Sequence, residues 1–393
     1  MKLHLAANYD PTLVDRLEEN SVTTVYGKLP NDVVGGGRAA YMGKNLGWPE
    51  LTRYIKKLRD TGRRFSYLLN SSCMGNREWS RRTQKKLRKL LDKIVRSGAE
   101  SVTVSTPYLL RLIKKNYPDL RVTVGVYAQV DTVKRVRFWE SQGADAITLE
   151  SFSLNREFDR LRKIVEVASA ELILIANHLC LPNCSLQPYH QNGFAHSSDN
   201  SRELFIDYCY LKCNQQRFSN PALFISSSWI RPEDIKIYEQ LGFNTFKLLE
   251  RDLPTSVLLE RVAAYENREY HGNLARLFLS HSFGRPRVST SLWEYLLKLL
   301  SAPFKSLRRA NNFMKDQGLL HELDECPVII DSEQIPTDFL SFFNDKDCLN
   351  SDCSNCGYCA EIAGRAVTIT SALTEKKYTN FLDRLETGEF WDV

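Results

Sequence analysis

The stretch SGAESVTV, residues 97–104, contains the junction that decides the fold. Related stretches recur as QGADAITL at 142–149 and LGFNTFKL at 241–248. In each, a glycine stands where a helix would end, and an apolar run follows at once. Glycine adopts the left-handed conformation at a helix C-terminus at little steric cost. Each stretch therefore predicts a helix that leads directly into a strand.

Eight short apolar runs alternate with amphipathic segments along the chain. The runs span 3–7, 22–27, 65–70, 101–105, 122–127, 146–150, 171–176 and 245–249. The helical segments between them lie near 11–19, 50–60, 78–97, 106–116, 131–142, 155–169 and 232–241. Nearly continuous apolar strands are typical of parallel sheets with helices on their faces. This α/β pattern predicts a TIM-type (β/α)8 barrel, with a doubly wound sheet as the runner-up and residues 224–226 as a further short strand.

The alternation stops near residue 285. A turn-rich stretch, SFGRPRVSTS at 282–291, is followed by a basic amphipathic stretch, LLKLLSAPFKSLRRA at 296–310. We therefore expect a barrel domain at 1–285 and a small cysteine-rich domain at 286–393, with a final helix near 375–387.

Composition indicates a globular protein without a membrane partner. The 393 residues are 43% hydrophobic and 25% charged, with a formal net charge of +6. No apolar run approaches the roughly 20 residues that span a bilayer, and the N-terminus lacks the apolar core of a signal peptide. We expect a cytoplasmic protein. Its ten cysteines then point to metal ligation or redox chemistry rather than to disulfides.

Four of the cysteines form a compact C-terminal set. Cys348, Cys353, Cys356 and Cys359 fall within twelve residues, and the last three recur every third position. This spacing resembles iron–sulfur loops more than the paired motifs of structural zinc sites. It favours a second 4Fe-4S cluster here, with zinc as the alternative. Gly357 would ease a tight wrap of the chain.

A second set is spread along the chain at Cys180, Cys184, Cys209 and Cys213. By spacing alone these residues could bind zinc, a cluster or nothing. Cys180 and Cys184 directly follow the seventh predicted strand, at the face where barrel enzymes hold their chemistry, which favours ligation. Cys73 follows the third strand at the same face and is a candidate substrate contact.

Several polar residues are candidates for catalysis or binding. His190 and His196 flank an expected loop around Gly193, where either could move a proton. His178 could support a ligand through its second nitrogen. For each histidine, an ordinary packing or backbone-bonding role is the alternative.

The last strand supplies further candidates. On a strand, alternation directs Lys247 into the barrel, where it would contact substrate, while Glu250 and Arg251 lie at the rim and could hold an anion or each other. Arg38 is a candidate carboxylate clamp. The preceding glycines of GGGRAA, 35–40, could expose N–H groups to an anion or form a plain flexible turn.

The basic segment 80–98 has an apolar stripe of Leu87, Leu90, Leu91 and Ile94. Its lysines and arginines favour a solvated outer face over an RNA contact, because few aromatic residues lie among them. No GxSxG or HExxH motif is present, so no familiar hydrolytic machinery is visible.

Three segments carry a resemblance to a known family. TTVYGKLPNDVVGGGRAA at 23–40 and SWIRPEDIKIYEQLGFNTFKLLERD at 228–252 resemble its second strand with glycine/arginine turn and its last strand. AITLE at 146–150 and ELILIA at 171–176 precede a histidine and cysteines in the expected order. Together these segments, within residues 1–285, resemble the peptidase U32 family.

The resemblance implies a barrel whose mouth holds a 4Fe-4S cluster on Cys180, Cys184, Cys209 and Cys213, with Lys247, Glu250 and Arg251 ending the last strand. Some members of the family are labelled peptidases, and others support oxygen-independent hydroxylation. This chain departs from the family's pattern. CLPNCSLQPYHQNGFAH replaces the usual glycine-rich stretch around the cysteines, and the C-terminal cysteine set is not a common feature. The substrate therefore cannot be transferred.

The sequence thus predicts an iron–sulfur-dependent oxidoreductase, an oxygen-independent hydroxylase or related tailoring enzyme, acting on a small or carrier-bound substrate. An electron-donor protein is an expected partner. A U32-type peptidase, an RNA-modifying enzyme and a non-enzymatic metal-bound partner in a heteromer are the alternatives.

Overall fold

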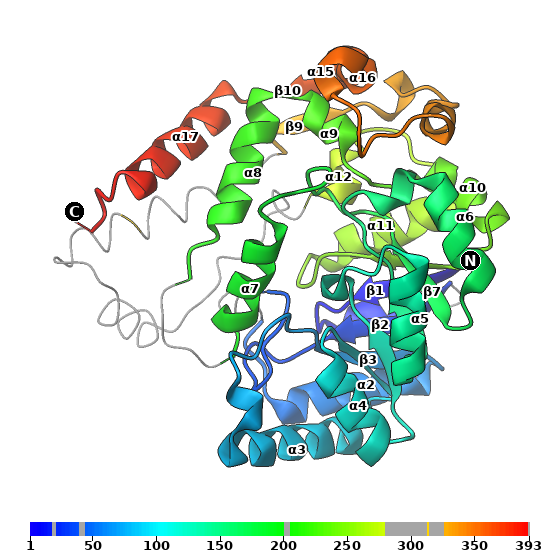
Figure 1. Cartoon of the computed structure of the whole chain (residues 1–393), viewed down its shortest axis with the longest axis vertical. Helices are drawn as coiled ribbons and strands as arrows, with labels where there is room; N and C mark the ends of the chain where they lie inside the picture. The colour runs from blue at the N-terminus through cyan, green and yellow to red at the C-terminus, as the bar shows by residue number, and fades with distance from the viewer. Residues whose placement is uncertain (18–20, 39–43, 200–204, 280–312, 314–325, 392–393) are drawn as a thin grey trace.

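Eight parallel strands pair in sequence order, and β8 also pairs with β1, so the sheet closes into a barrel. The strands are β1 (Lys2–Ala6), β2 (Val22–Gly27), β3 (Arg64–Leu69), β4 (Ser101–Val104), β5 (Arg121–Val124), β6 (Ala146–Thr148), β7 (Glu171–Ile175) and β8 (Thr245–Leu248). The computed structural model describes residues 1–17, 21–38, 44–199, 205–279, 313 and 326–391 (Figure 1). The predicted TIM-type barrel is confirmed.

Helices follow the strands, as the βα alternation predicts. They are α1 (Pro11–Asp15), α2 (Trp48–Asp60), α3 (Arg81–Arg96), α4 (Pro107–Asn116), α5 (Val133–Gln142), α6 (Phe158–Val167), α11 (Thr255–Asn267) and α12 (Ala275–Phe278). On α3 the predicted stripe is confirmed, since its buried residues are Leu87, Leu90, Leu91 and Ile94. The basic side chains of α3 lie on the other faces, and no observation tests their contact with RNA.

The three glycines of the recurring stretch all have left-handed backbones. Gly98, Gly143 and Gly242 have φ angles of 85°, 101° and 106°. A β-carbon at Gly242 would lie 2.9 Å from the side chain of Val165, so both backbone conformation and space require glycine there. The three helix-to-strand junctions therefore have the left-handed glycine that the sequence prediction requires.

A long excursion separates β7 from β8. It carries α7 (Gln187–Ser197), α8 (Tyr208–Ser219), α9 (Ala222–Ser226) and α10 (Ile235–Gln240). The prediction of a strand at 224–226 is wrong, because these residues belong to α9. Pro221 starts this helical turn with φ −58°, and Phe224 and Ile225 are both buried. A short apolar run buried on all sides has no period that separates strand from helix.

The C-terminal segment packs on this excursion. Its β9 (Val328–Ile330) and β10 (Val367–Ile369) form an antiparallel pair, followed by α17 (Ala372–Glu386), the predicted final helix. Helix α16 (Tyr358–Ala366) lies against α9, and α17 lies beside α8 (Figure 1). The predicted boundary at 285–286 and the stretches 282–291 and 296–310 lie outside the described residues.

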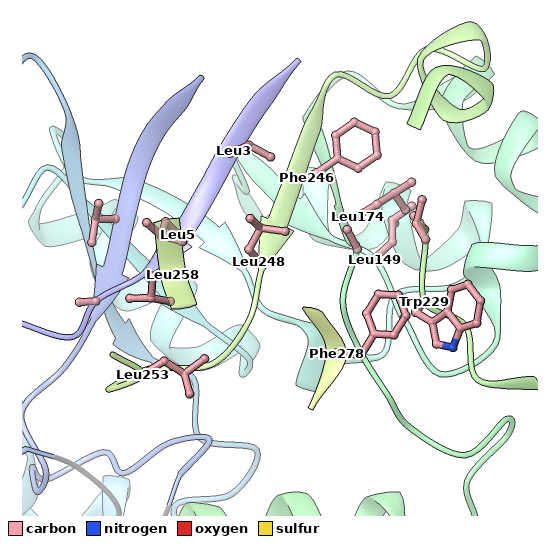
Figure 2. Close-up of a cluster of buried hydrophobic side chains, with 14 of the residues drawn as sticks. Leu3, Leu5, Leu149, Leu174, Trp229, Phe246, Leu248, Leu253, Leu258 and Phe278 are labelled. Atoms are coloured by element: carbon pink, nitrogen blue, oxygen red, sulfur yellow. The ribbon is translucent and has the colours of Figure 1, made fainter. Parts of the chain in front are cut away.

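Outward side chains of the barrel form the main core. Figure 2 shows leucines of β1 near Phe246 and Leu248 of β8, and Trp229 close to Phe278. Trp229 stacks on Phe278 with ring centroids 4.8 Å apart, and on Phe339 of the C-terminal segment at 5.7 Å. Burial of each large apolar side chain contributes about 1.5–3 kcal/mol. The C-terminal segment therefore shares its core with the barrel.

The inside of the barrel is polar, whereas branched apolar residues fill most such barrels. Inward side chains that include His4, Thr24, Glu171 and Lys247 line a small cavity. Nearer to the carboxyl ends of the strands, Ala6, Tyr26, Leu68 and Leu249 form a separate apolar cluster. Among the described helices, none combines the length and the apolarity that a membrane crossing requires.

Replacement of Gly143 by alanine tests the junctions. Its φ of 101° is unfavourable for alanine, whereas the added β-carbon would make only an ordinary contact at 3.4 Å with Lys114. We expect Gly143→Ala to lower the free energy of unfolding by about 1 kcal/mol, measured by denaturant titration. Gly364→Ala, on α16 with no neighbouring atom within 4 Å, is the control and should be neutral or slightly stabilising. Equal effects of the two changes would contradict the expectation.

Candidate functional site

Polar side chains gather at the mouth of the barrel, where the strands end. Cys73 follows β3, Tyr127 follows β5, His178 and Cys180 follow β7, and Arg251 follows β8. All carboxyl ends of parallel strands open at one rim, which is where barrel enzymes hold their active sites. The mouth is therefore the candidate site.

The first cysteine set lies on the excursion between β7 and β8. Cys180 and Cys184 are in the loop after β7, and Cys209 and Cys213 are one turn apart on α8, hence on one helix face. Burial raises the pKa of Cys180, and negative charge on Cys213 and Cys184 raises it further. Negative charge on Cys184 also raises the pKa of Cys209 and the pKa of Cys213. The structure thus brings the four thiols into one neighbourhood.

The sulfur atoms are not drawn together around one point. In the described ranges, no three His, Cys, Asp or Glu side chains converge as ligands of a single metal ion. Cys209 Sγ donates to the carbonyl of Leu186 at 3.7 Å, and Cys213 Sγ donates to that of Tyr210 at 3.3 Å. Four thiols nevertheless have the donor chemistry of zinc and of iron–sulfur clusters. That these four cysteines bind a metal stays a prediction. The charges around the thiols test whether the site suits an anionic metal centre.

Arg217 is a buried cation beside these thiols. Its side chain is on α8, one turn after Cys213, and the residue is only 4% exposed. Nη1 lies 3.5 Å from Cys213 Sγ and 3.3 Å from Asn214 Oδ1, and Nη2 donates to the carbonyl of Leu179. Nε has no partner, and no carboxylate of the described residues pairs with this guanidinium. A buried guanidinium keeps its charge and requires a neighbouring anion.

Metal-bound thiolates would satisfy this requirement. Neutral thiols carry no charge and cannot compensate the guanidinium. Burial raises the pKa of Cys180 and of Cys213, whereas the positive charge of Arg217 lowers both and so favours the thiolate forms. The residues present therefore fit an anionic inorganic centre held by Cys180, Cys184, Cys209 and Cys213.

His178 links Cys180 to the neighbouring strand end. Its Nε2 lies 3.1 Å from Cys180 Sγ, and its Nδ1 lies 2.7 Å from Ser151 Oγ. Burial lowers the pKa of His178 to about 4, so the ring is neutral near pH 7. A neutral ring can either donate its N–H to the sulfur or accept the thiol proton. The arrangement thus suits a supported ligand or a thiol–imidazole pair.

A strained turn after β8 places two of the predicted residues. Glu250 and Asp252 have positive φ angles of 91° and 62°, and both carboxylates pair with Arg38, at 2.7 Å and 3.2 Å. Arg38 also donates to the carbonyl of Arg251 at 2.6 Å. Arg38 thus clamps carboxylates of the protein itself, and Glu250 pairs with Arg38 rather than with Arg251. Non-glycine residues in this backbone region often mark functional sites.

The Arg251 side chain is the available cation of the mouth. It makes no hydrogen bond or ion pair with the described residues, and it is half-buried. Its charge nevertheless lowers the pKa of Lys247 and opposes the rise that burial causes in the pKa of Tyr127. An anionic group that enters the mouth would find Arg251 unpaired.

The glycine turn before Arg38 is not an anion site. Gly35 N–H donates to Asp32 Oδ1 at 2.8 Å, Gly36 N–H to Ser198 Oγ at 3.0 Å and Gly37 N–H to Asn70 Oδ1 at 3.3 Å. A β-carbon at Gly35 would lie 2.2 Å from the carbonyl of Ala195, so the turn packs tightly under α7. These N–H groups are therefore bonded within the protein, and the anion-binding interpretation is wrong.

The expected loop around Gly193 is also wrong, because residues 187–197 form α7. Proline is well tolerated in the first turn of a helix, where Pro188 stands. Gly193 leaves room for Phe205, which would lie 2.9 Å from an added β-carbon. His190 Nε2 is 2.9 Å from Asp207, and His196 Nδ1 is 3.2 Å from Asp199. The histidines are thus paired with carboxylates on a helix, and their catalytic roles stay predictions.

Two predicted substrate contacts have different surroundings. Cys73 lies at the rim, where its Sγ accepts the N–H of Gly75 at 3.3 Å. Lys247 lies inside the barrel, as strand alternation predicts, with Nζ 4.0 Å from the ring centroid of Tyr26. Because Tyr26 belongs to the apolar cluster nearer the strand ends, the lysine lies beneath the mouth rather than in it.

The C-terminal cysteines lie on consecutive short elements of one segment. Cys348 follows η7 (Phe339–Asn344), Cys353 and Cys356 are on α15 (Cys353–Cys356), and Cys359 is the second residue of α16. Gly357 turns the chain between these helices with φ 70°, as its position predicts. Burial raises the pKa of Cys359, and charges on Cys353 and Cys356 raise it further. These four thiols also share one neighbourhood.

Sequence reasoning missed Arg217, Ser151 and Tyr127. Arg217 had a detectable signal, since it lies four residues after Cys213 in a segment that could be helical. Ser151 and Tyr127 had none, because each becomes part of the mouth only when strands from different parts of the chain end side by side.

A sequence profile and a curated relative point to one family. A sequence profile described as peptidase family U32 matches residues 21–214. MJ1657, an uncharacterized protease of Methanocaldococcus jannaschii, is 33% identical over 253 residues, which cover 64% of this chain and 74% of that protein. The solved structure of the U32 peptidase Mk0906 matches with TM-score 0.48 and 21% identity, over 64% of this chain and 93% of that one. A D-psicose 3-epimerase matches with TM-score 0.30 and 12% identity, over 51% and 82%.

The buried Lys247 generates a pH prediction. Burial, with a smaller contribution from Arg251, lowers its pKa from 10.5 to about 7. Between pH 7 and the unfolded-state pKa, the unfolded chain binds more protons, so stability rises with pH. Lys247→Met should therefore stabilise the fold by up to about 4 kcal/mol at pH 7 or below, and this gain should shrink toward pH 10.

Denaturant midpoints at pH 6, 8 and 10 check this expectation. Lys163→Met, at an exposed position on α6, is the control and should show no such pH-dependent gain. If the two variants gave parallel pH profiles, the buried lysine would not be the cause.

Proposed function

The chain belongs to peptidase family U32, and on this premise we propose that it is an iron–sulfur-dependent oxidoreductase with its substrate site in the barrel mouth. One observation carries the proposal: the buried guanidinium of Arg217, which pairs with no carboxylate of the described residues, lies 3.5 Å from Cys213 Sγ. The other three thiols are in the loop after β7 and on α8. The family resemblance supports the identity of the centre, a 4Fe-4S cluster on Cys180, Cys184, Cys209 and Cys213.

Charge explains why the thiols would be metal-bound. Removal of an ion from water costs several kcal/mol unless a partner charge compensates it. Burial raises the pKa of Cys180 and Cys213, so these thiols alone stay neutral near pH 7. Coordination deprotonates thiols outright. A bound cluster would thus supply the negative charge that Arg217 requires.

The other residues of the mouth have separate tasks. His178, held by Ser151, would donate its Nε2–H to the Cys180 sulfur and orient that ligand. Arg251 would bind an anionic group of the substrate, and Arg38 would hold the turn that presents it. When bound, the cluster would supply one-electron transfer to a substrate held between these groups.

This arrangement suits an oxygen-independent hydroxylation or a related tailoring step. The unpaired Arg251 favours a small or carrier-bound substrate with a carboxylate or phosphate group. The C-terminal cysteine set would hold a second centre that exchanges electrons with a partner protein or stiffens the segment.

A peptidase is the second candidate, favoured by the contact of His178 with Cys180. Cys180 Sγ lies 3.1 Å from the imidazole of His178, whose other nitrogen contacts the hydroxyl of Ser151. A cysteine nucleophile, its base and the group that orients the base are arranged in this order. The same sulfur cannot be both a cluster ligand and a free nucleophile, so the two candidates make opposite predictions.

Metal analysis of the full-length protein, purified without oxygen, tests the first candidate. We expect a brown protein with broad visible absorbance and about four iron and four sulfide per occupied cysteine set. Replacing Cys180 and Cys213 by serine should remove the iron of the mouth while leaving that of the C-terminal set.

Cys326→Ser is the matched control, because Cys326 belongs to neither set and its Sγ donates to the carbonyl of Val328 at 3.1 Å. This variant should keep all the iron. A colourless protein with stoichiometric zinc, or one without metal, would overturn the oxidoreductase proposal.

Peptide hydrolysis tests the second candidate. If the iron-free protein cleaved peptides, and Cys180→Ala and His178→Ala abolished cleavage while Cys209→Ala did not, the thiol–imidazole pair would be the active site. We expect no such cleavage, since the raised pKa of Cys180 keeps the thiol neutral.

A further inference from the structure

Lys247 is a buried lysine inside the barrel without a carboxylate partner. The residue is 9% exposed, and its Nζ makes no ion pair or hydrogen bond with the described residues. It lies 4.0 Å from the ring centroid of Tyr26, whose face stabilises a cation but does not replace a negative charge. By contrast, the buried Lys28 has a carboxylate oxygen of Asp32 at 3.0 Å. A buried ammonium that lacks such a partner favours an anion beside it.

Strand pairing places hydroxyl groups around this ammonium. Thr103, Thr148 and Lys247 are on β4, β6 and β8, and they belong to one layer of inward side chains, because alternate strands supply each layer of such a barrel. Thr148 is fully buried, and its hydroxyl has no hydrogen-bond partner among the described residues. Thr123 lines the same cavity from β5. The cavity therefore offers hydroxyl donors together with one unpaired ammonium.

The lining of this cavity carries more positive than negative charge. Lys2 and Arg64 begin β1 and β3, and neither makes an ion pair with the described residues. Among the described side chains that line the cavity, Glu171 alone has a carboxylate. Its two oxygens are engaged by Arg121 at 2.6 Å and by a threonine hydroxyl at 2.7 Å. The field of these side chains attracts a small anion from the amino ends of the strands.

The size of the cavity restricts which anion fits. Its volume is about 20 Å³, and a single water molecule needs roughly 10–15 Å³ of such space. A monatomic anion fits in this volume, whereas a phosphate or a metabolite does not. The apolar cluster of Ala6, Tyr26, Leu68 and Leu249 lies between this cavity and the mouth, so substrates of the mouth do not reach it.

We propose that the barrel interior binds one chloride ion on the ammonium of Lys247 and the hydroxyl of Thr148. The ion compensates the buried charge of Lys247, as Asp32 compensates that of Lys28. A water molecule in the same place would solvate the ammonium but leave its charge uncompensated. The site lies beneath the mouth and is independent of the function proposed for it.

Denaturant titration of the full chain at pH 6 tests this inference. Lys247, with a pKa of about 7, is mostly protonated at this pH, whereas burial and the charge of Lys247 lower the pKa of His4 to about 3 and keep its ring neutral. Sodium chloride is compared with sodium gluconate at equal ionic strength, because gluconate is too large for the cavity. Chloride at about 0.3 M should lower the unfolding equilibrium constant about 10-fold, which corresponds to a Kd of about 30 mM.

Three variants assign the effect to the cavity. Lys247→Met should abolish the difference between chloride and gluconate. Thr148→Val removes the unpartnered hydroxyl at nearly constant volume and should reduce the difference several-fold. Lys163→Met, at an exposed position on α6, is the matched control for the lost lysine charge and should keep the full chloride effect.

Bromide, which scatters anomalously, locates the ion directly. Crystals of the parent grown in sodium bromide should show an anomalous peak beside Lys247 Nζ, and crystals of Lys247→Met should show none there. A chloride effect in Lys247→Met or in Thr148→Val as large as in the parent would overturn the inference, and so would bromide peaks confined to the protein surface. If Lys247→Met failed to fold, Thr148→Val and the bromide peak of the parent would still decide. Neither measurement depends on iron in the mouth, so failure of the oxidoreductase proposal would leave this result unchanged.

Discussion

The pairing of β8 with β1 is the constraint on which the site depends. Leu5 pairs with Leu248, and this register closes the sheet and sets the turn after β8 opposite the turn after β2. Arg38 can then reach Glu250 and Asp252, which lie more than two hundred residues further along the chain. The same closure leaves the excursion between β7 and β8 free to cover the mouth. It is this excursion, rather than the strands, that brings the cysteines there.

Buried charge is the second organising feature. Arg217 is 4% exposed, has a buried N–H group without a partner, and lies 3.5 Å from Cys213 Sγ. By contrast, the buried Arg231 has a carboxylate at 2.8 Å on two of its nitrogens. Thiolates in a metal centre would supply the negative charge that Arg217 lacks.

The sequence predicts the barrel well because local chemistry decides it. Gly98, Gly143 and Gly242 end helices in the conformation that only glycine adopts readily, so the strand positions follow within a few residues. The errors come from segments whose structure tertiary contacts decide. Residues 222–226 form a helix that packs against α16, and α7 accommodates Gly193 because Phe205 fills the space of a side chain.

The site is less predictable than the fold for the same reason. Cysteine spacing identifies both sets, because the thiols of each lie within reach along one or two segments. By contrast, the guanidinium of Arg156 lies within 5.0 Å of the ring centroids of Trp229, Phe339 and Phe343, and no spacing of these residues in the chain indicates that they meet. Likewise the glycine turn at 35–37 has the composition of an anion site, but its N–H groups are satisfied by Asp32, Ser198 and Asn70 once the chain folds.

The position of Cys180 bears on the choice between ligand and nucleophile. A nucleophilic thiol needs a lowered pKa, usually from a helix N-terminus or a charged imidazole. Here the adjacent His178 is neutral, with a pKa near 4, and Cys180 is in a loop near Cys184 and Cys213. A peptidase would gain nothing from those thiols or from a buried guanidinium beside them. A cluster ligand gains from both. The other thiols complete the coordination of the metal, and the guanidinium stabilises the negative charge of the bound thiolates.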